Sequence, residues 1–332
     1  MTRFGHTGAV TGPRSAVVVN PVKVPDMDLL RRTLCSGLAR AGWPEPVWFE
    51  TTPEDPGRGM ASRAVKEGAE LVFACGGDGT VMACVTALAG TDVAMAVLPA
   101  GTGNLLAANL GLATDPATGI QVALDGGRRR IDVGVMGDRH FAVMAGMGFD
   151  AQMLAGTSEK AKRHLGWIAY VAGGLKHLRD HPMRARIVLD GGPPMPRHPR
   201  TVIVGNVGRL QGGVRLLSAA RPDDGKLDVA ILSPNNLGHW ASLAWAVIRR
   251  RKRVPLMETY TAERVEIYSN HAQPRQLDGD LIAPGRTMRI RVRHKALLLC
   301  VPQPDADPDL AYDAEAASRE AEEVRAAADD TV

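Results

Sequence analysis

The sequence predicts two domains: an α/β domain with a doubly wound parallel sheet, followed by a β-rich, sandwich-like domain. In the first 130 residues, short apolar runs alternate with segments of helical spacing, as in parallel sheets covered by helices. After residue 130, apolar runs follow one another across Asp-Gly and Gly-Gly turns, which favours antiparallel strands. The length of 332 residues suits two domains. We expect domains over 15–130 and 131–302, and an acidic, flexible tail over 303–332.

The first domain is expected to contain four parallel strands with helices between them. Leu30, Leu34 and Leu38 recur every four residues, which is typical of a helix with one buried face. The predicted strands cover residues 17–19, 47–50, 71–75 and 93–98, and the predicted helices cover residues 28–41, 59–68, 81–88 and a segment ending at 109. Glycine-rich turns follow the third and fourth strands. Open α/β sheets bind their ligands at this end of their strands.

The second domain is expected to consist mainly of antiparallel strands. Turn dipeptides such as Asp190-Gly191 and Asp224-Gly225 separate its apolar runs. Two segments with helical spacing, 160–179 and 239–251, interrupt the strands. The predicted strands cover residues 131–136, 141–145, 184–190, 201–206, 226–232, 263–268 and 287–301.

Charge is distributed unevenly along the chain. The net charge is +4, but residues 304–332 carry ten acidic and two basic residues, so the tail carries −8 and the rest +12. A basic body suggests an anionic partner such as a nucleotide, a nucleic acid or a membrane surface. Aromatic residues make up 4%, which argues against base stacking as the main mode of binding. Four cysteines without C-x-x-C spacing argue against a zinc site and a disulfide framework.

The sequence shows no membrane-spanning segment. The N-terminal residues lack the apolar core of a signal peptide, and the longest apolar run, 237–248, is too short to cross a bilayer core of about 30 Å. We therefore expect a cytoplasmic protein. The helix at 239–251 ends in the basic run Arg249–Arg253. That run is either a peripheral contact with anionic lipid or the solvated end of a packed helix.

Two glycine-rich turns predict phosphate binding. The first is Gly76-Gly77-Asp78-Gly79-Thr80 and the second is Gly101-Thr102-Gly103-Asn104. Glycines let backbone N–H groups approach an anion, and the following helix presents its positive end. Asp78 would repel a phosphate unless Mg²⁺ lies between them or the carboxylate takes a proton from a hydroxyl. The alternative is a plain turn in which Asp78 only caps a helix. Neither turn matches a P-loop or a G-x-G-x-x-G dinucleotide motif.

With these motifs the chain resembles the diacylglycerol kinase catalytic-domain family of lipid kinases, including bacterial and sphingosine-kinase-like members. The resemblance covers about residues 15–302. It rests on Asn20-Pro21, on Thr51, on both glycine turns with Leu98-Pro99 before the second, on Asp223-Asp224-Gly225 and on Leu277-Asp278-Gly279-Asp280. It implies an NAD-kinase-like first domain and an active site in the cleft between the domains.

The resemblance also implies roles for individual residues. ATP would lie along Asn20 and Pro21, Thr51, Gly76–Thr80 and the turn Gly101–Asn104. Asp280 would act as the base for the lipid hydroxyl, at a position where the family usually has Glu. A structural Mg²⁺ would be bound by the side chain of Asp224 and the carbonyls of Arg221 and Lys226. Asp223-Asp224-Gly225 also suits a plain hairpin turn.

These features predict an ATP-dependent lipid kinase that uses Mg²⁺, acts in phospholipid biosynthesis and transfers a γ-phosphoryl group to a lipid hydroxyl, most simply that of a diacylglycerol-like lipid. Asp280 and Asp78 are the expected catalytic residues. Two alternatives remain open: an NAD-kinase-like enzyme with a soluble substrate, and a non-catalytic nucleotide- or anion-binding protein. Nucleic acid is not expected as a partner.

Overall fold

The computed structural model describes residues 12–100, 104–112, 115–148, 182–208, 216–217, 220–234 and 254–305, with isolated positions between 238 and 249. The chain forms two compact units, one of residues 1–131 and 296–332, the other of residues 132–295. The predicted division left 131–302 as one continuous segment and did not include this return to the first unit. The return arises because the last strand is long enough to belong to both units.

The first unit contains a parallel sheet. Its order is β4-β3-β1-β2, and all neighbouring strands run in the same direction. The end of the last strand adds to its edge through Leu298 and Leu299, which pair with Ala94 and Met95. The strands are β1 (Ser15–Val19), β2 (Val47–Glu50), β3 (Leu71–Gly76), β4 (Ala94–Pro99) and the end of β14 (Asp280–Cys300).

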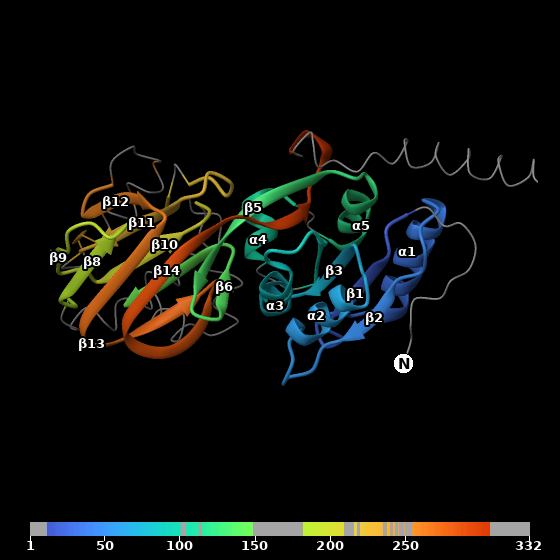
Figure 1. Ribbon diagram of the computed structural model, residues 1–332, viewed down its shortest axis with the longest axis horizontal. Coiled ribbons are helices and arrows are strands. Elements are labelled where there is room, and N and C mark those ends of the chain that lie inside the picture. Colours follow the sequence, from blue (N-terminus) through green and yellow to red (C-terminus); the bar gives the residue numbers. More distant parts are fainter. Residues whose placement is uncertain are drawn as a thin grey trace, which may run out of the picture. The chain divides into compact units, whose positions relative to one another are not determined.

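Helices cover both faces of this sheet (Figure 1). α1 (Met27–Arg40) and α5 (Pro116–Leu124) share one core with the strands, and α2 (Arg58–Lys66) and α3 (Asp78–Leu88) contact the strands from the other side. α4 (Leu105–Leu110) is a short helix. β1, β3 and β4 are buried along their whole length, as strands covered on both faces are. The doubly wound α/β prediction is confirmed.

Two of these helices differ from the prediction. α5 was not predicted, although the Asp115 carboxylate accepts the N–H of Thr118 and Pro116 follows at the first helical position. Both are ordinary signals for the start of a helix. α3 begins at Asp78, three residues earlier than expected, because Gly77 is its N-cap.

The second unit is rich in β-structure, and its described strand pairs are antiparallel, as predicted. β9 and β12 were not predicted, and a single strand was predicted at 141–145 where the structure has β6 and β7. The strands are β5 (Arg128–Met136), β6 (Arg139–Phe141), β7 (Met144–Gly148), β8 (Ala185–Leu189), β9 (Met195–Arg197), β10 (Thr201–Gly205), β11 (Leu227–Leu232), β12 (Met257–Ala262), β13 (Arg264–Leu277) and β14.

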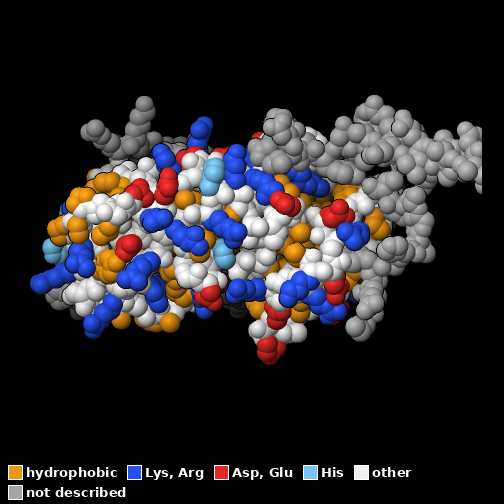
Figure 2. All heavy atoms as spheres, in the orientation of Figure 1, with side chains coloured by type: hydrophobic (Ala, Val, Ile, Leu, Met, Phe, Trp, Pro, Cys, Tyr) orange, Lys and Arg blue, Asp and Glu red, His pale blue; other side chains and the backbone are white. Residues whose placement is uncertain are grey.

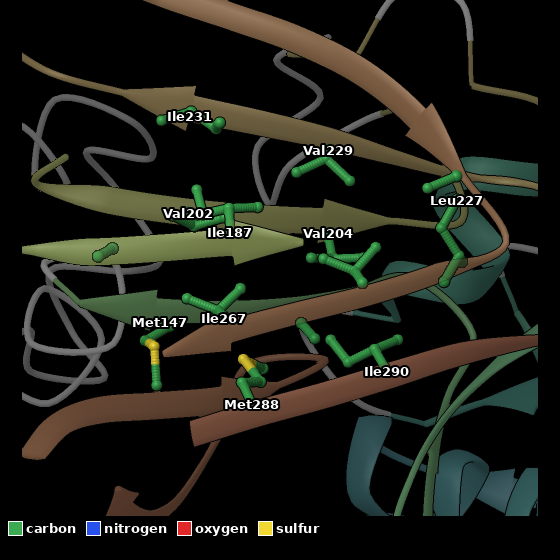
Figure 3. Packing of buried hydrophobic residues seen from close by; sticks show 14 of the residues in the cluster. Met147, Ile187, Val202, Val204, Leu227, Val229, Ile231, Ile267, Met288 and Ile290 are labelled. Carbon is green, nitrogen blue, oxygen red and sulfur yellow. The ribbon is translucent and has the colours of Figure 1, made fainter. Parts of the chain in front are cut away.

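β13 organises the core of the second unit. Its first half pairs with β8, its last three residues pair with β7, and β14 runs along it. The register shifts between Tyr268 and Gln273, so the strand bends there and can serve both neighbours. The prediction ended this strand at Tyr268 because the alternation of apolar and polar residues stops there. Figure 3 shows side chains such as Ile187, Val204, Ile267 and Ile290 pointing into one shared interior.

Some predicted elements lie outside the described residues, namely the helix at 160–179, most of the helix at 239–251 and the tail from 306 on. Within the described part of the chain, no helix has both the length and the apolar character needed to cross a membrane.

Candidate active site

Asn20 and Thr51 follow two strands that end at the same edge of the parallel sheet. The backbone N–H of Asn20 donates to the carbonyl of Cys75 (2.9 Å), and that of Thr51 donates to the carbonyl of Val19 (2.8 Å). The Asn20 side chain accepts the N–H of Val22 (3.1 Å), which closes a tight turn through Pro21. Both predicted nucleotide-binding positions are therefore fixed by the sheet itself.

The first glycine turn joins β3 to α3 at this same edge. A Cβ on Gly76 would lie 2.7 Å from the Cβ of Thr80, so only glycine fits, and the Thr80 side chain is buried behind it. A Cβ on Gly79 would meet no atom within 4 Å. The first helical bond runs from the N–H of Val81 to the carbonyl of Gly77, and the N–H groups of residues 78–80 precede it. An open, positive helix start of this kind suits a phosphate group.

Asp78 connects the two glycine turns. Its Oδ1 accepts the backbone N–H of Leu105, the first residue of α4, at 2.6 Å. Asn104 precedes this helix with a φ of 41° and makes no side-chain capping bond to it, so Asp78 supplies that function from a distance of 27 residues in sequence. The Asp78 carboxylate therefore caps α4, although Asp78 itself is the first residue of α3.

The second glycine turn is described only at its ends. Gly101, Thr102 and Gly103 lie outside the described residues. Ala100 before them donates its N–H to the carbonyl of Gly76 (3.0 Å), and Asn104 after them lies at the start of α4. The structure therefore brings Asn20, Thr51, Gly76, Asp78 and the ends of the second turn to one edge of the first unit.

In the second unit, Asp280 begins β14 directly after a two-residue hairpin turn. Leu277 and Asp280 are paired across the turn, and Asp278 and Gly279 both have positive φ values, 48° and 91°. This is the backbone of the tight turn that Asp-Gly favours. The N–H of Gly279 donates to the side chain of Gln276 (2.9 Å). Strand pairing and this hydrogen bond hold the turn, which presents Asp280 and Leu281 as exposed residues.

Asp278 has a structural role that its sequence motif did not predict. Its carboxylate accepts three consecutive backbone N–H groups, from Ala142 (2.8 Å), Val143 (2.9 Å) and Met144 (2.6 Å). The side chain is buried, and its own N–H donates to the carbonyl of Met144 (2.8 Å). Asp278 therefore fastens the hairpin to the start of β7. In the sequence, Asp278 stands out only as an Asp that follows the apolar strand residue Leu277 and begins a turn. Its remote backbone partners could not be inferred from the sequence.

The predicted metal-binding residues lie in the turn before β11. Asp224 is exposed, and its Oδ1 accepts the N–H of Lys226 (3.0 Å), while Arg221 lies at the start of the turn. The nearby Asp228 carboxyl is buried. Its pKa is raised to about 6, mainly by this burial and to a smaller extent by the negative charge of Asp224.

Asp132 supports this turn and was not predicted. Its carboxylate is fully buried and accepts the N–H groups of Gly225 and Lys295 (2.6 Å each), and it lies 2.8 Å from Nδ1 of His294. Its carbonyl accepts the buried side-chain amide of Asn206 (2.7 Å). An Asp inside the apolar run 131–135 needs such partners, because a buried carboxylate without them is costly. An acidic residue within an apolar run was therefore the sequence signal for a buried Asp132 with hydrogen-bond partners.

The residues at this turn offer oxygen ligands of the type that Mg²⁺ prefers: one carboxylate and two carbonyls. Among the described residues, no group of three His, Cys, Asp or Glu side chains could hold a metal ion. A Mg²⁺ at Arg221, Asp224 and Lys226 would therefore take water molecules as its remaining ligands. With water as the remaining ligands, the oxygen atoms of Arg221, Asp224 and Lys226 fit Mg²⁺.

Two family models match the chain in succession. The diacylglycerol kinase catalytic domain matches residues 14–136, and the YegS C-terminal NAD kinase beta sandwich-like domain matches residues 142–301. A Chromohalobacter salexigens protein named "Probable lipid kinase YegS-like" is 35% identical over 233 residues, 67% of this chain and 73% of that protein. A protein of the same name from Pseudomonas putida is 30% identical over 298 residues, 88% of this chain and 96% of that protein.

Solved structures share the fold. A diacylglycerol kinase from Bacillus anthracis superposes with a TM-score of 0.66 at 18% identity, over 90% of this chain and 98% of that one. An NAD kinase from Archaeoglobus fulgidus in complex with ATP gives a TM-score of 0.51 at 13% identity, over 88% and 95%. The solved structures show the shared fold, and the matching sequences establish that the chain belongs to the diacylglycerol kinase catalytic domain family, alongside proteins named as probable YegS-like lipid kinases.

Proposed function

We propose that the protein is an ATP-dependent lipid kinase that phosphorylates the hydroxyl of a diacylglycerol-like lipid. The family supports the reaction class, and the relatives' name supports a lipid acceptor. The observation that carries the residue assignment is the hairpin in which Asp278 is buried and fastened while Asp280 is exposed. A turn held in this way that presents one carboxylate suits a proton acceptor.

The nucleotide would bind at the edge of the parallel sheet in the first unit. The N–H groups at the start of α3 would hold phosphate oxygens, and the open space at Gly79 would let them approach. Thr51 and the turn at Asn20 and Pro21 would border the nucleotide, as would Gly101–Asn104. Asp78 would keep the second glycine turn in place through its bond to Leu105. Mg²⁺ bound with ATP would neutralise charge on the phosphates during transfer.

Asp280 would accept the proton of the lipid hydroxyl. The bond between the γ-phosphorus and the bridging oxygen of ADP would break as the bond between phosphorus and the lipid oxygen forms, and the hydroxyl proton would pass to the carboxylate. Asp is one methylene shorter than Glu, and an error of about 1 Å in position can cost on the order of 100-fold in rate. The backbone of the hairpin would therefore have to place Asp280 closer to the hydroxyl than a Glu would need to lie.

The decisive experiment is a panel of acceptors incubated with ATP labelled at the γ-phosphate. Diacylglycerol, ceramide, a sphingoid base and a polyprenol would be offered in neutral detergent micelles, and NAD⁺ in solution. We expect label in a lipid product and none in NAD⁺. Label in NAD⁺ alone would favour the soluble-substrate alternative, to which the fold of the A. fulgidus NAD kinase lends support. ATP binding without any transfer would favour the non-catalytic alternative.

The role of Asp280 is tested by Asp280→Asn. We expect turnover to fall by about 100-fold or more, since general-base catalysis contributes about 10²–10⁴-fold, while the affinity for ATP stays unchanged. Asp138→Asn is the matched control, because Asp138 is also an exposed turn residue of the second unit. Full activity of Asp280→Asn would refute the assignment, and recovery by Asp280→Glu would support it.

A further inference from the structure

The outer side of β14, β13 and β8 presents an unusual array of arginines. On β13 the buried residues Val265 and Ile267 alternate with the outward residues Arg264, Glu266 and Tyr268. The pairing of the strands aligns these outward residues with those of both neighbours. Tyr268 is opposite Arg186 on β8, Glu266 is opposite Arg289 on β14, and Arg264 is opposite Arg291 on β14. We call this surface the arginine face; its basic residues are Arg184, Arg186, Arg264, Arg289, Arg291 and Arg293, and all six are exposed.

Part of the arginine face is held in a fixed arrangement. The guanidinium groups of Arg186 and Arg289 lie 5.1 Å and 5.7 Å from the centre of the Tyr268 ring. Arg289 also forms an ion pair with Glu266 (3.6 Å), and the Tyr268 hydroxyl donates to the same carboxylate. Glu266 is the acidic residue among the outward residues Arg264, Glu266 and Tyr268 of β13 and the arginines opposite them. Two arginines therefore keep their orientation on a rigid aromatic support.

The other part is electrostatically unfavourable in the isolated protein. Arg264 and Arg291 are directly opposed on neighbouring antiparallel strands, and like charges in this position destabilise a sheet. Two acids lie near Arg264, but within the described residues neither forms an ion pair with its guanidinium: Glu263 precedes it in the chain, and the Asp190 carboxylate accepts the backbone N–H groups of Glu263 and Arg264. Figure 2 shows more Lys and Arg than acidic side chains over the region where β13 and β14 run in Figure 1. Stability does not account for these arginines, whereas an anionic partner does.

We propose that the arginine face binds the anionic headgroups of a phospholipid bilayer. The inference rests on the proposed function, because a lipid kinase must take its acceptor from a membrane. The face is a sheet surface about 10 Å by 14 Å, as three strands and alternate residues dictate, and it presents a layer of charge to a flat surface. Arginine binds phosphate oxygens through two parallel N–H groups, which lysine cannot do. Each such residue near an anionic membrane strengthens binding about fivefold.

The test compares Arg264→Gln/Arg291→Gln with the full-length wild-type protein in vesicle sedimentation. Vesicles of phosphatidylcholine alone are compared with vesicles that also contain phosphatidylglycerol. The matched control is Arg32→Gln/Lys66→Gln, which removes the same charge from exposed helix positions of the first unit. We expect the first variant to bind the anionic vesicles about 30-fold more weakly, and the control to bind as the wild type does. Neutral vesicles should bind none of the three proteins.

Two further measurements keep the result interpretable. Thermal unfolding of the variant should be unchanged or slightly raised, because the substitution removes a repulsion between like charges. Phosphorylation of a lipid in neutral micelles should also be unchanged, whereas failure of the proposed function would abolish it in the wild type as well. Equal vesicle binding by variant and wild type would overturn the proposal. Binding of duplex DNA that depends on Arg264 and Arg291, without vesicle binding, would overturn it in favour of nucleic acid. Lack of vesicle binding by the full chain would also overturn the proposal. The acidic tail of this chain would then be the candidate anionic partner of the arginine face.

Discussion

The two units build their candidate active-site segments from different chemical groups. In the first unit, the glycine turns at the edge that would hold a nucleotide consist of backbone N–H groups and glycines, and the carboxylate of Asp78 caps a helix. In the second unit, buried carboxylates hold the loops, with Asp278 accepting three N–H groups and Asp132 accepting two. One unit thus exposes its backbone donors, and the other satisfies such donors internally.

The difference teaches which substitutions each unit tolerates. A site made of backbone is damaged by added atoms, because a new side chain fills the space in which an anion would lie. A loop held by a buried carboxylate is damaged by removed atoms, because each N–H group that loses its acceptor while buried costs about 1–3 kcal/mol. The following substitutions test this contrast.

The largest effect is expected for Asp278→Ala. The substitution leaves the N–H groups of Ala142, Val143 and Met144 without their acceptor, and we expect the free energy of unfolding to fall by about 3–5 kcal/mol. Denaturant unfolding of purified protein measures this change. Asp280→Ala is the control two residues away, with an expected change within about 0.5 kcal/mol because the side chain is exposed. Equal losses in both variants would contradict the distinction between the two acids.

A smaller effect is expected for Gly76→Ala. The added Cβ would lie 2.7 Å from the Cβ and Oγ1 of Thr80, which is itself buried and cannot move away easily. We expect a loss of about 1–3 kcal/mol in unfolding free energy, as for other overpacked positions. Thermal or chemical unfolding would show it. If Thr80→Ala in the same chain, which removes Oγ1 from the contact, does not restore part of the loss, the clash with Oγ1 is not its cause.

Gly79→Ala should act in the opposite direction on stability. Its Cβ would meet no atom within 4 Å, and alanine within a helix is more stable than glycine by about 0.5–1 kcal/mol. The same methyl group would stand beside the N–H groups that are expected to bind phosphate, so affinity for Mg²⁺·ATP should fall. Calorimetric titration together with unfolding separates the two effects. Unchanged ATP affinity would argue against phosphate binding at this turn.

The mildest test is chemical labelling of the four cysteines, all of which belong to the first unit. Burial raises the pKa of Cys75 and Cys84 to about 12 and that of Cys300 to about 11, so these thiols stay protonated at pH 8. Cys35 is only partly buried, although burial raises its pKa as well. We expect iodoacetamide to modify Cys35 first and the others only after unfolding, as peptide mass spectrometry would reveal. Early modification of Cys84 would show that α3 opens readily.

Local patterns predicted the first unit well. Apolar runs and glycine turns placed β1 to β4 within two residues, and for β1, β3 and β4 the reason is that strands buried on both faces are mostly apolar. The helix α5 was not predicted, although Asp115 and Pro116 are ordinary signals for the start of a helix. The second unit was harder, since β13 changes partners at a bend and its alternation of apolar and polar residues breaks there.

The candidate site shows the same difference between features set by local motifs and features set by remote partners. The glycine turns and the Asp-Gly hairpin are short motifs, so the sequence displays them directly. The roles of Asp278 and Asp132 depend on partners more than 90 residues away, such as Ala142 for the first and Gly225 for the second. Spacing along the chain carries no information on such pairs. The bond from Leu105 to Asp78 is of the same kind, and it gives Asp78 a structural partner that the phosphate argument did not foresee.

The long strand β14 has a consequence for dissecting the protein. Its last residues pair with β4, the N–H of Gly90 donates to the carbonyl of Ala296 (2.6 Å), and the N–H of Val301 donates to the carbonyl of Gly127 (3.0 Å). A fragment that stops near residue 136 would lack this strand and leave β4 as an uncovered sheet edge, which promotes aggregation. A sound nucleotide-binding fragment would instead graft residues 296–305 onto the first 131 through a short linker, with residues 132–295 treated as an insertion.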